Sequence, residues 1–94
     1  MDSKEIYTKL LELYGDKQII IAIEELSELQ KELCKALRYN SNYDNIVEEI
    51  ADVEIMLEQM KLYFNILNKD LERMKKLKIK RTKERLGLWQ RKKL

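Results

Sequence analysis

The near absence of helix-breaking residues constrains this chain most strongly. Its 94 residues include no proline and only two glycines, Gly15 and Gly87. Leu, Ile, Glu and Lys dominate the rest, and this composition favours helix throughout. We therefore expect an all-α fold, and the length fits one small domain that covers residues 1–94. A chain of this size buries only a limited core, so oligomerisation is an expected source of further burial.

Breaks in the helical pattern predict four helices. Their expected ranges are residues 3–14, 17–38, 44–64 and 69–86. Ser3 is the expected N-cap of the first helix, and Asp44 or Asn45 that of the third. The three turn-forming residues at 40–42 give the clearest loop signal. Gly87 suits the C-terminal cap of the fourth helix.

Apolar residues recur at spacings of three and four along the second and third expected helices, which indicates one apolar stripe on each. On the second helix the stripe comprises Ile19, Ala22, Leu26, Leu29, Leu33 and Leu37. On the third helix it comprises Ile46, Ile50, Val53, Leu57, Met60 and Phe64. The short loop between these helices favours antiparallel packing of the two stripes. Residues 19–23 are apolar nearly all round, which predicts a subunit interface near Ile20 and Ile23.

Two clusters of carboxylates occupy matching positions on these helices. Glu25 and Glu28 lie at the edge of the first stripe, and Glu49 and Asp52 lie at the edge of the second. Like charges three residues apart on one helix repel, so each pair costs stability unless a cation offsets it. If the helices pack antiparallel, the four acids converge beside the core. Oxygen ligands of this kind suit Mg²⁺ or Mn²⁺ better than zinc or copper.

The residues that are missing exclude several kinds of site. The chain has no histidine and one cysteine, Cys34. It therefore has no Ser-His-Asp triad, no Cys-His pair, no internal disulfide and no thiolate zinc site. Its longest apolar run is too short to cross a bilayer, and its N-terminus lacks the order of a signal peptide. These features predict a cytoplasmic protein without a membrane partner.

The net charge of +2 conceals two regions of opposite sign. Residues 1–72 carry 8 Lys/Arg and 16 Asp/Glu, a net charge of −8, whereas residues 73–94 carry 11 and 1, a net charge of +10. In this basic C-terminal arm Lys78, Arg81 and Arg85 recur at helical spacing on one face. An acidic body with a basic arm is typical either of phosphate handling or of a nucleic-acid-binding tail.

Together the acidic clusters resemble a family motif. The sequence Glu24-Glu25-x-x-Glu28 followed by Glu49-x-x-Asp52 is similar to the signature of the MazG-like all-α nucleoside triphosphate pyrophosphohydrolases. This superfamily includes dimeric dUTPases, dCTP pyrophosphatases and phosphoribosyl-ATP pyrophosphohydrolases. The resemblance covers about residues 17–86. It implies a four-helix MazG-like bundle completed by oligomerisation into a homodimer or homotetramer.

The same resemblance implies roles for individual residues. The implied Mg²⁺ ligands are Glu25, Glu28, Glu49 and Asp52, and Glu24 joins them in the implied catalytic set. Glu24 and Glu48 project further round each helix, and either could orient a water molecule. The implied contacts to substrate phosphates are Lys78, Arg81 and Arg85.

The resemblance also implies a reaction. The enzyme would use Mg²⁺, or Mn²⁺ in its place, to hydrolyse a nucleoside triphosphate to the monophosphate and pyrophosphate. Two alternatives stay open: a catalytically silent relative, and a non-catalytic helical interaction module with a basic tail that binds nucleic acid. The paired acids favour the enzyme and disfavour nucleic acid as the partner, but they do not select a nucleobase.

Overall fold

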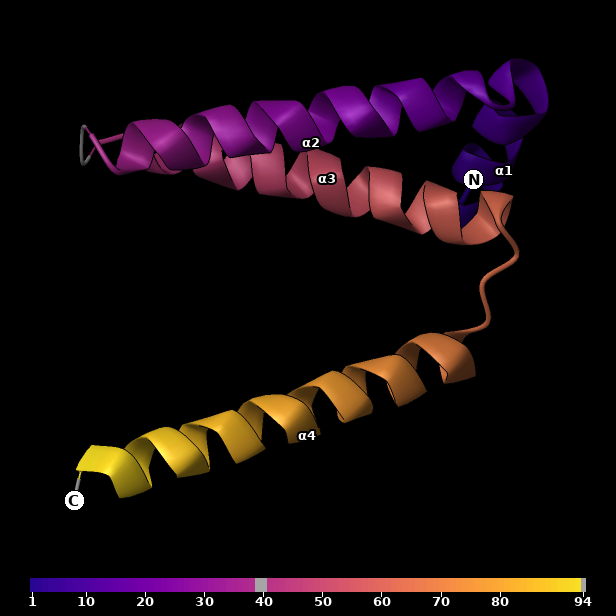
Figure 1. Ribbon diagram of the computed structural model, residues 1–94. Helices are drawn as coiled ribbons and strands as arrows, with labels where there is room; N and C mark the ends of the chain where they lie inside the picture. Colours follow the sequence, from indigo (N-terminus) through magenta and orange to yellow (C-terminus); the bar gives the residue numbers. More distant parts are fainter. Residues whose placement is uncertain (39–40, 94) are drawn as a thin grey trace.

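The computed structural model describes residues 1–38 and 41–93, and in this part of the chain it contains four α-helices and no strand. The helices are α1 (Ser3–Tyr14), α2 (Lys17–Ala36), α3 (Tyr43–Tyr63) and α4 (Asn68–Lys93) (Figure 1). The prediction of an all-α fold is confirmed. Of the predicted loop at 40–42, Asn40 lies outside the described residues. No helix in residues 1–38 and 41–93 combines the length and apolar character that crossing a membrane requires.

The second and third helices form an antiparallel hairpin, and α1 packs across its base (Figure 1). Between α2 and α3 lies an interhelical seam, which we define by the buried or half-buried residues of the two facing surfaces. From α2 these are Gln18, Ala22, Glu25, Leu29 and Glu32, and from α3 they are Ile46, Glu49, Val53, Met56 and Met60, with the buried Gln59 beside Met60 and in contact with Gln18. The seam is therefore partly polar, with acidic or amide side chains at four of its positions.

The predicted stripe on α2 differs from the seam that the structure shows. Leu26, Leu33 and Leu37 are 48%, 49% and 90% exposed. Their places in the seam are taken by polar residues with partners. Gln18 Nε2 donates a hydrogen bond to Gln59 Oε1 at 2.8 Å, and Gln59 is only 2% exposed. Burying a polar group is tolerated when its hydrogen bonds are met, so apolar spacing alone gave the wrong rotation for this helix.

The predicted stripe on α3 is also only half correct. Val53 is buried and Ile46 and Met60 are half-buried, but Ile50, Leu57 and Phe64 are exposed.

Each residue of an α-helix lies about 100° further round the axis than the one before it. In an antiparallel pair, the residues that follow the seam positions therefore lie on one side of the hairpin. Those that precede them lie on the other side.

Several helix boundaries differ from the prediction by one or two residues. Asp2, not Ser3, caps α1, since its carboxylate accepts a hydrogen bond from the Glu5 backbone N–H at 2.8 Å. The third helix begins at Tyr43, before both expected caps. The fourth helix continues through Gly87 to Lys93, so the predicted cap at Gly87 is wrong. No proline follows to stop the helix, and one interior glycine costs only about 1 kcal/mol.

A polar clamp joins the two ends of the hairpin loop. Asn42 Nδ2 donates hydrogen bonds to the Glu32 carbonyl oxygen at 2.8 Å and to Glu32 Oε2 at 2.9 Å. The Glu32 carboxylate also pairs with Lys35 Nζ at 3.5 Å. The hydrogen bond from Asn42 is the main reason that the pKa of Glu32 lies below its ordinary value of 4.5. The clamp holds α2 and α3 in register at the loop end of the hairpin.

Removing the clamp should destabilise the fold without altering the acids nearer the centre of the hairpin. We expect Asn42→Ala to lower the free energy of unfolding by about 1–2 kcal/mol, because the buried Glu32 carboxylate loses its best donor. Urea denaturation measures the change, and Asn45→Ala, at an exposed position in the first turn of α3, is the matched control. Equal midpoints for the two variants would show that the clamp contributes nothing.

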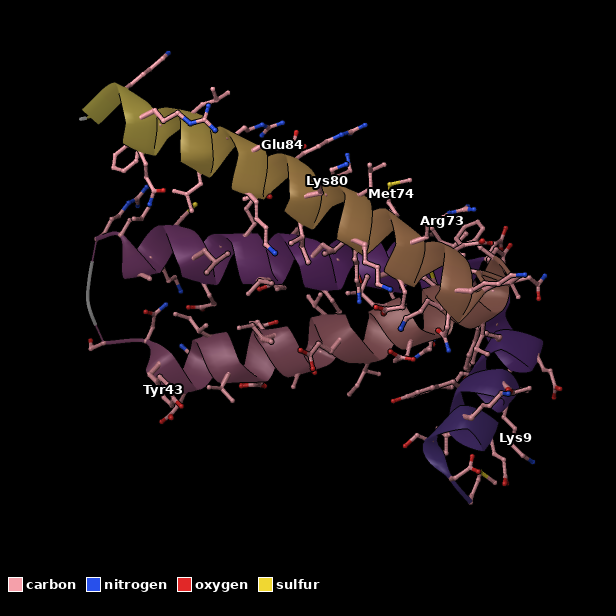
Figure 2. The ribbon with its side chains drawn as sticks, turned by 90° about the horizontal axis from the view of Figure 1, so that it is seen from below. Lys9, Tyr43, Arg73, Met74, Lys80 and Glu84 are labelled. Atoms are coloured by element: carbon pink, nitrogen blue, oxygen red, sulfur yellow. The ribbon has the colours of Figure 1, made fainter. Side chains whose placement is uncertain are left out.

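The fourth helix stands apart from the other three. No Cα atom of α4 lies within 8 Å of a Cα atom in α1, α2 or α3, all of which are described throughout. In Figure 2, which views the molecule from below, α4 overlaps the hairpin only at one end and diverges from α2 towards the C-terminus, and Figure 1 shows it separated from both α2 and α3. The radius of gyration is 17.6 Å, whereas a compact domain of this length has a radius of about 12 Å. One chain alone does not build the predicted four-helix bundle.

Candidate metal centre

Three of the four predicted metal ligands meet near the middle of the hairpin. Glu25 of α2 and Glu49 and Asp52 of α3 each offer a carboxylate oxygen, and these oxygens all lie within 4.8 Å of one another. Glu25 and Glu49 occupy seam positions, which explains why they face each other across the helix pair. The prediction that acids from both helices converge is thus met by these three residues.

Three further acids, Glu24, Glu28 and Glu48, lie beside this trio on one side of the hairpin. Glu24, Glu28, Glu48 and Asp52 each precede a seam position, so they share one side, which we call the acidic face. Glu28 does not belong to the group of carboxylates whose oxygens lie within 4.8 Å of one another. Its charge nevertheless raises the pKa of both Glu25 and Glu49. Glu24 and Glu48 are exposed, and their charges act on Glu25 and Glu49, respectively. The trio therefore opens towards the acidic face.

The pKa values of Glu25 and Glu49 show that it is unfavourable to bring these charged acids together. Partial burial raises the pKa of Glu25 above its ordinary value of 4.5, and the Asp52 charge and a hydrogen bond with Asp52 raise it further. Burial also raises the pKa of Glu49, followed by the charges of Asp52 and Glu25. The charges that act on the two groups are all negative. A cation at the trio would offset this repulsion.

One oxygen of the trio also lacks a hydrogen-bond partner. Glu49 Oε2 is buried, and no donor among the described residues reaches it. A buried carboxylate oxygen without a donor is costly, and most such atoms in folded proteins are paired. Mg²⁺ and Mn²⁺ bind carboxylate oxygens of this kind, so the donor set fits a hard divalent cation.

The raised pKa values predict how the metal-free protein responds to pH. Between pH 4.5 and the raised pKa values of Glu25 and Glu49, the folded chain binds more protons than the unfolded chain. The free energy of unfolding therefore falls as the pH rises through this window. Glu32 acts in the opposite sense, since its lowered pKa contributes stability that is lost only as the pH falls below 4.5.

In EDTA we therefore expect a higher melting temperature at about pH 5 than at about pH 7.5. Thermal unfolding followed by circular dichroism measures the two midpoints. In Glu49→Gln the difference should shrink, because one of the two groups no longer titrates. A wild-type midpoint that rises steadily from pH 5 to pH 7.5 would contradict the assignment.

The predicted phosphate contacts do not reach the trio within one chain. Lys78, Arg81 and Arg85 are exposed on α4, which packs against no other helix. The ion pairs identified on α4 are local, between Arg73 and Asp70 at 3.4 Å and between Lys75 and Glu72 at 3.5 Å. The structure thus brings the acids together but leaves the predicted basic residues apart from them.

Sequence reasoning missed the amide pair that lies two helical turns from the trio. Gln18 is seven residues before Glu25, and Gln59 is seven residues after Asp52. The repeat of seven places each amide on the same side of its helix as the acid. This spacing of seven residues could have indicated that the two glutamines face each other, but polar residues were not expected between the helices. The buried pair fixes the register in which the trio meets.

Comparisons with protein-family models, with curated proteins and with solved structures find no match to this chain. The resemblance to the all-α pyrophosphohydrolases therefore consists of the sequence motif alone.

Proposed function

We propose that the protein is a Mg²⁺-dependent nucleoside triphosphate pyrophosphohydrolase of the MazG-like type, with Mn²⁺ as an alternative ion. The observation that carries the proposal is the trio of Glu25, Glu49 and Asp52, whose oxygens lie within 4.8 Å of one another and include the unpartnered Glu49 Oε2. The sequence motif supports the same assignment. The products would be a nucleoside monophosphate and pyrophosphate.

In this proposal the acids divide the work of binding. Glu25 and Glu49 would hold the ion in the seam, and Asp52 and Glu28 would extend the ligand set towards the acidic face. A Mg²⁺ ion held by these residues would neutralise phosphate charge and would lower the pKa of a water molecule, so that a nucleophile is available near neutral pH. Glu24 and Glu48 are exposed beside the trio, and either would accept a proton from water at the acidic face.

The triphosphate would approach with its metal ions from the acidic face, because the opposite side of the trio is flanked by the apolar side chains of Leu26 and Ile50. Without ions its negative charge would be repelled by the exposed acids there. Arg81 and Arg85 would hold phosphate oxygens with planar, bidentate donors, and Lys78 would act as a point charge. These donors would stabilise the charge that develops as the bond between the α- and β-phosphates breaks.

A panel of ribonucleoside and deoxyribonucleoside triphosphates, assayed for pyrophosphate with Mg²⁺ and with EDTA, tests the proposal. We expect pyrophosphate, and not orthophosphate, from at least one nucleotide, and no release in EDTA. Release of orthophosphate alone would mean cleavage at a different bond. No release from any nucleotide would favour a catalytically silent relative.

The exposed basic helix favours a second candidate, an interaction module that binds nucleic acid. α4 contains every charged residue of the segment 73–94, whose net charge is +10, and packs against no other helix. Binding through phosphate contacts weakens steeply with salt. Strong DNA binding with a steep salt slope at millimolar Mg²⁺, together with a negative nucleotide panel, would favour this candidate.

A further inference from the structure

The fourth helix carries a second row of cations that the proposed reaction does not use. Between residues 69 and 83, basic residues recur at alternating spacings of four and three. We call this row the lysine-rich stripe, and its members are Lys69, Arg73, Lys76, Lys80 and Lys83. This spacing keeps side chains on one face of an α-helix, and α4 is helical from Asn68 to Lys93. The stripe therefore runs along the helix for about 21 Å, because an α-helix rises about 1.5 Å per residue.

The lysine-rich stripe is distinct from the residues that we propose to bind the substrate phosphates. Successive residues of an α-helix differ by about 100° round the axis, so the stripe and the row of Lys78, Arg81 and Arg85 point about 150° apart. The body of a helix with its side chains is about 10–12 Å across and separates the two rows. They are thus two different anion-binding surfaces on one helix.

The cations of the stripe are accessible to an anion. All five are exposed. In the part of the chain that the structure describes, four of them take part in no ion pair: Lys69, Lys76, Lys80 and Lys83. Arg73 pairs with Asp70 at 3.4 Å, but its side chain is 79% exposed. An ion pair that is so open to water is weak, so Arg73 can exchange this carboxylate for a phosphate.

The position of α4 suits the binding of a long polyanion. Residues 1–72 carry a net charge of −8, so the rest of the molecule repels a polyanion. The fourth helix packs against no other helix, and Figure 1 shows it standing away from α2 and α3. Within residues 68–92 every residue except Leu71 and Gly87 is exposed. An extended ligand can therefore lie along α4 without resting on the acidic hairpin.

The composition of the stripe selects among the possible polyanions. Helices that lie on anionic membranes present apolar side chains to the lipid, and the stripe contains none. Proteins that bind single-stranded nucleic acid stack its bases on aromatic side chains, and the stripe contains no aromatic residue. Double-helical DNA carries one negative charge per about 1.7 Å of its axis, and lysine and arginine bind these phosphates without contacting the bases. A stripe built only of Lys and Arg fits this ligand best.

We propose that the lysine-rich stripe binds the phosphate backbone of double-helical DNA, independently of base sequence. The fourth helix lies along the duplex, and the five cations displace counterions from about five phosphates. The row of Lys78, Arg81 and Arg85 lies on the opposite side of the helix from the DNA. This binding does not depend on nucleotide hydrolysis. It operates beside the metal centre of the same chain, whereas the second candidate function replaces the enzyme.

The salt dependence of DNA binding tests the stripe. Binding of the full chain to a fluorescent duplex of about 20 base pairs is followed by anisotropy in EDTA, from about 50 to about 200 mM KCl. We expect the logarithm of the affinity to fall with the logarithm of the salt concentration with a slope of about −4.5, as for five phosphates. Duplexes of two different sequences should bind equally. No binding at the lowest salt, tighter binding of single-stranded DNA, or a marked preference for one sequence would overturn the proposal.

Two double variants with equal loss of charge locate the contact. Lys76→Gln with Lys80→Gln removes two cations of the stripe, and Lys78→Gln with Arg81→Gln removes two from the opposite side. Glutamine is a good helix former, so both variants should keep the helical circular dichroism of wild type. We expect the first to weaken DNA binding about tenfold or more and to reduce the salt slope by about 2, and the second to bind within about threefold of wild type. Equal losses in the two variants would mean that only the overall charge matters, and would overturn the proposal.

Hydrolysis supplies the reciprocal measurement. Lys76→Gln with Lys80→Gln should release pyrophosphate at the wild-type rate, because neither residue belongs to the proposed substrate site. Loss of both DNA binding and hydrolysis in this variant would overturn the separation of the two rows. A wild-type protein that hydrolyses no nucleotide would contradict the proposed function instead, and the two double variants would still decide where DNA binds.

Discussion

Replacing Asp52 with asparagine should abolish pyrophosphate release without unfolding the chain. The substitution keeps the shape of the side chain and removes the negative charge that most strongly acts on Glu49. We expect a loss of more than about 100-fold, because even residues that merely orient metal ligands are worth about 10- to 100-fold. Pyrophosphate release at saturating Mg²⁺ and nucleotide measures the effect.

The same substitution should leave the metal-free fold as stable as wild type or more so. Asp52 raises the pKa of both Glu25 and Glu49, which means that its charge repels theirs. Thermal unfolding in EDTA separates loss of chemistry from loss of structure. Glu54→Gln, at an exposed acid of the same helix, controls for removal of a charge and should retain activity. Full activity in Asp52→Asn, or equal losses in both variants, would reject the trio as the site.

Magnesium should raise the thermal stability of the wild-type protein, and a non-hydrolysable nucleoside triphosphate should raise it further. An ion that binds the folded trio and not the unfolded chain stabilises by mass action, by about 2.7 kcal/mol at a hundredfold excess over its dissociation constant. Relief of repulsion among Glu25, Glu49 and Asp52 is the physical source of this selectivity. Melting curves in EDTA, in Mg²⁺, and in Mg²⁺ with nucleotide give the three midpoints.

Two comparisons make this prediction specific. In Glu25→Gln the increase with Mg²⁺ should largely disappear, since a ligand is lost at the centre of the trio. Calcium should also stabilise wild type but support little turnover, because its looser coordination positions water and phosphate less strictly. Identical midpoints in all three wild-type conditions would mean that the acids form only a solvated surface.

The sequence was sufficient to predict the helices and the meeting of the acids. Local features decide both: missing prolines, turn residues at the hairpin loop, and matched spacing of Glu25 on α2 with Glu49 and Asp52 on α3. The helix count does not depend on tertiary packing. Once the hairpin is antiparallel, the two acidic segments have to lie near each other.

The rotation of α2 could not be predicted, because it depends on pairs of polar residues that are far apart in sequence. Gln18 and Gln59 are separated by 41 positions, and their hydrogen bond allows both to be buried. Leu26 and Leu33 are consequently turned outward. Apolar spacing finds the surfaces of a helix that avoid water, but it does not say which of these surfaces packs within the chain.

The position of α4 was also beyond prediction from spacing. Its basic stripe was expected beside the acids, whereas the structure leaves Lys78, Arg81 and Arg85 free of the hairpin. The mean hydropathy of the chain is low, at −0.55, and α4 is rich in charge, so little apolar burial ties this helix to its own chain. The spacing of its residues therefore does not determine where this helix lies.

Binding of Mn²⁺, followed by electron paramagnetic resonance of the free ion, tests the metal centre most directly, because it requires no knowledge of the preferred nucleobase. Wild type should remove at least one ion per chain from solution, and Mg²⁺ should compete for the site. Glu49→Gln should weaken this binding by more than about tenfold, whereas Glu54→Gln should leave it unchanged. A wild-type protein that leaves the Mn²⁺ signal unaltered, or a Glu49→Gln variant that binds as wild type does, would contradict the account.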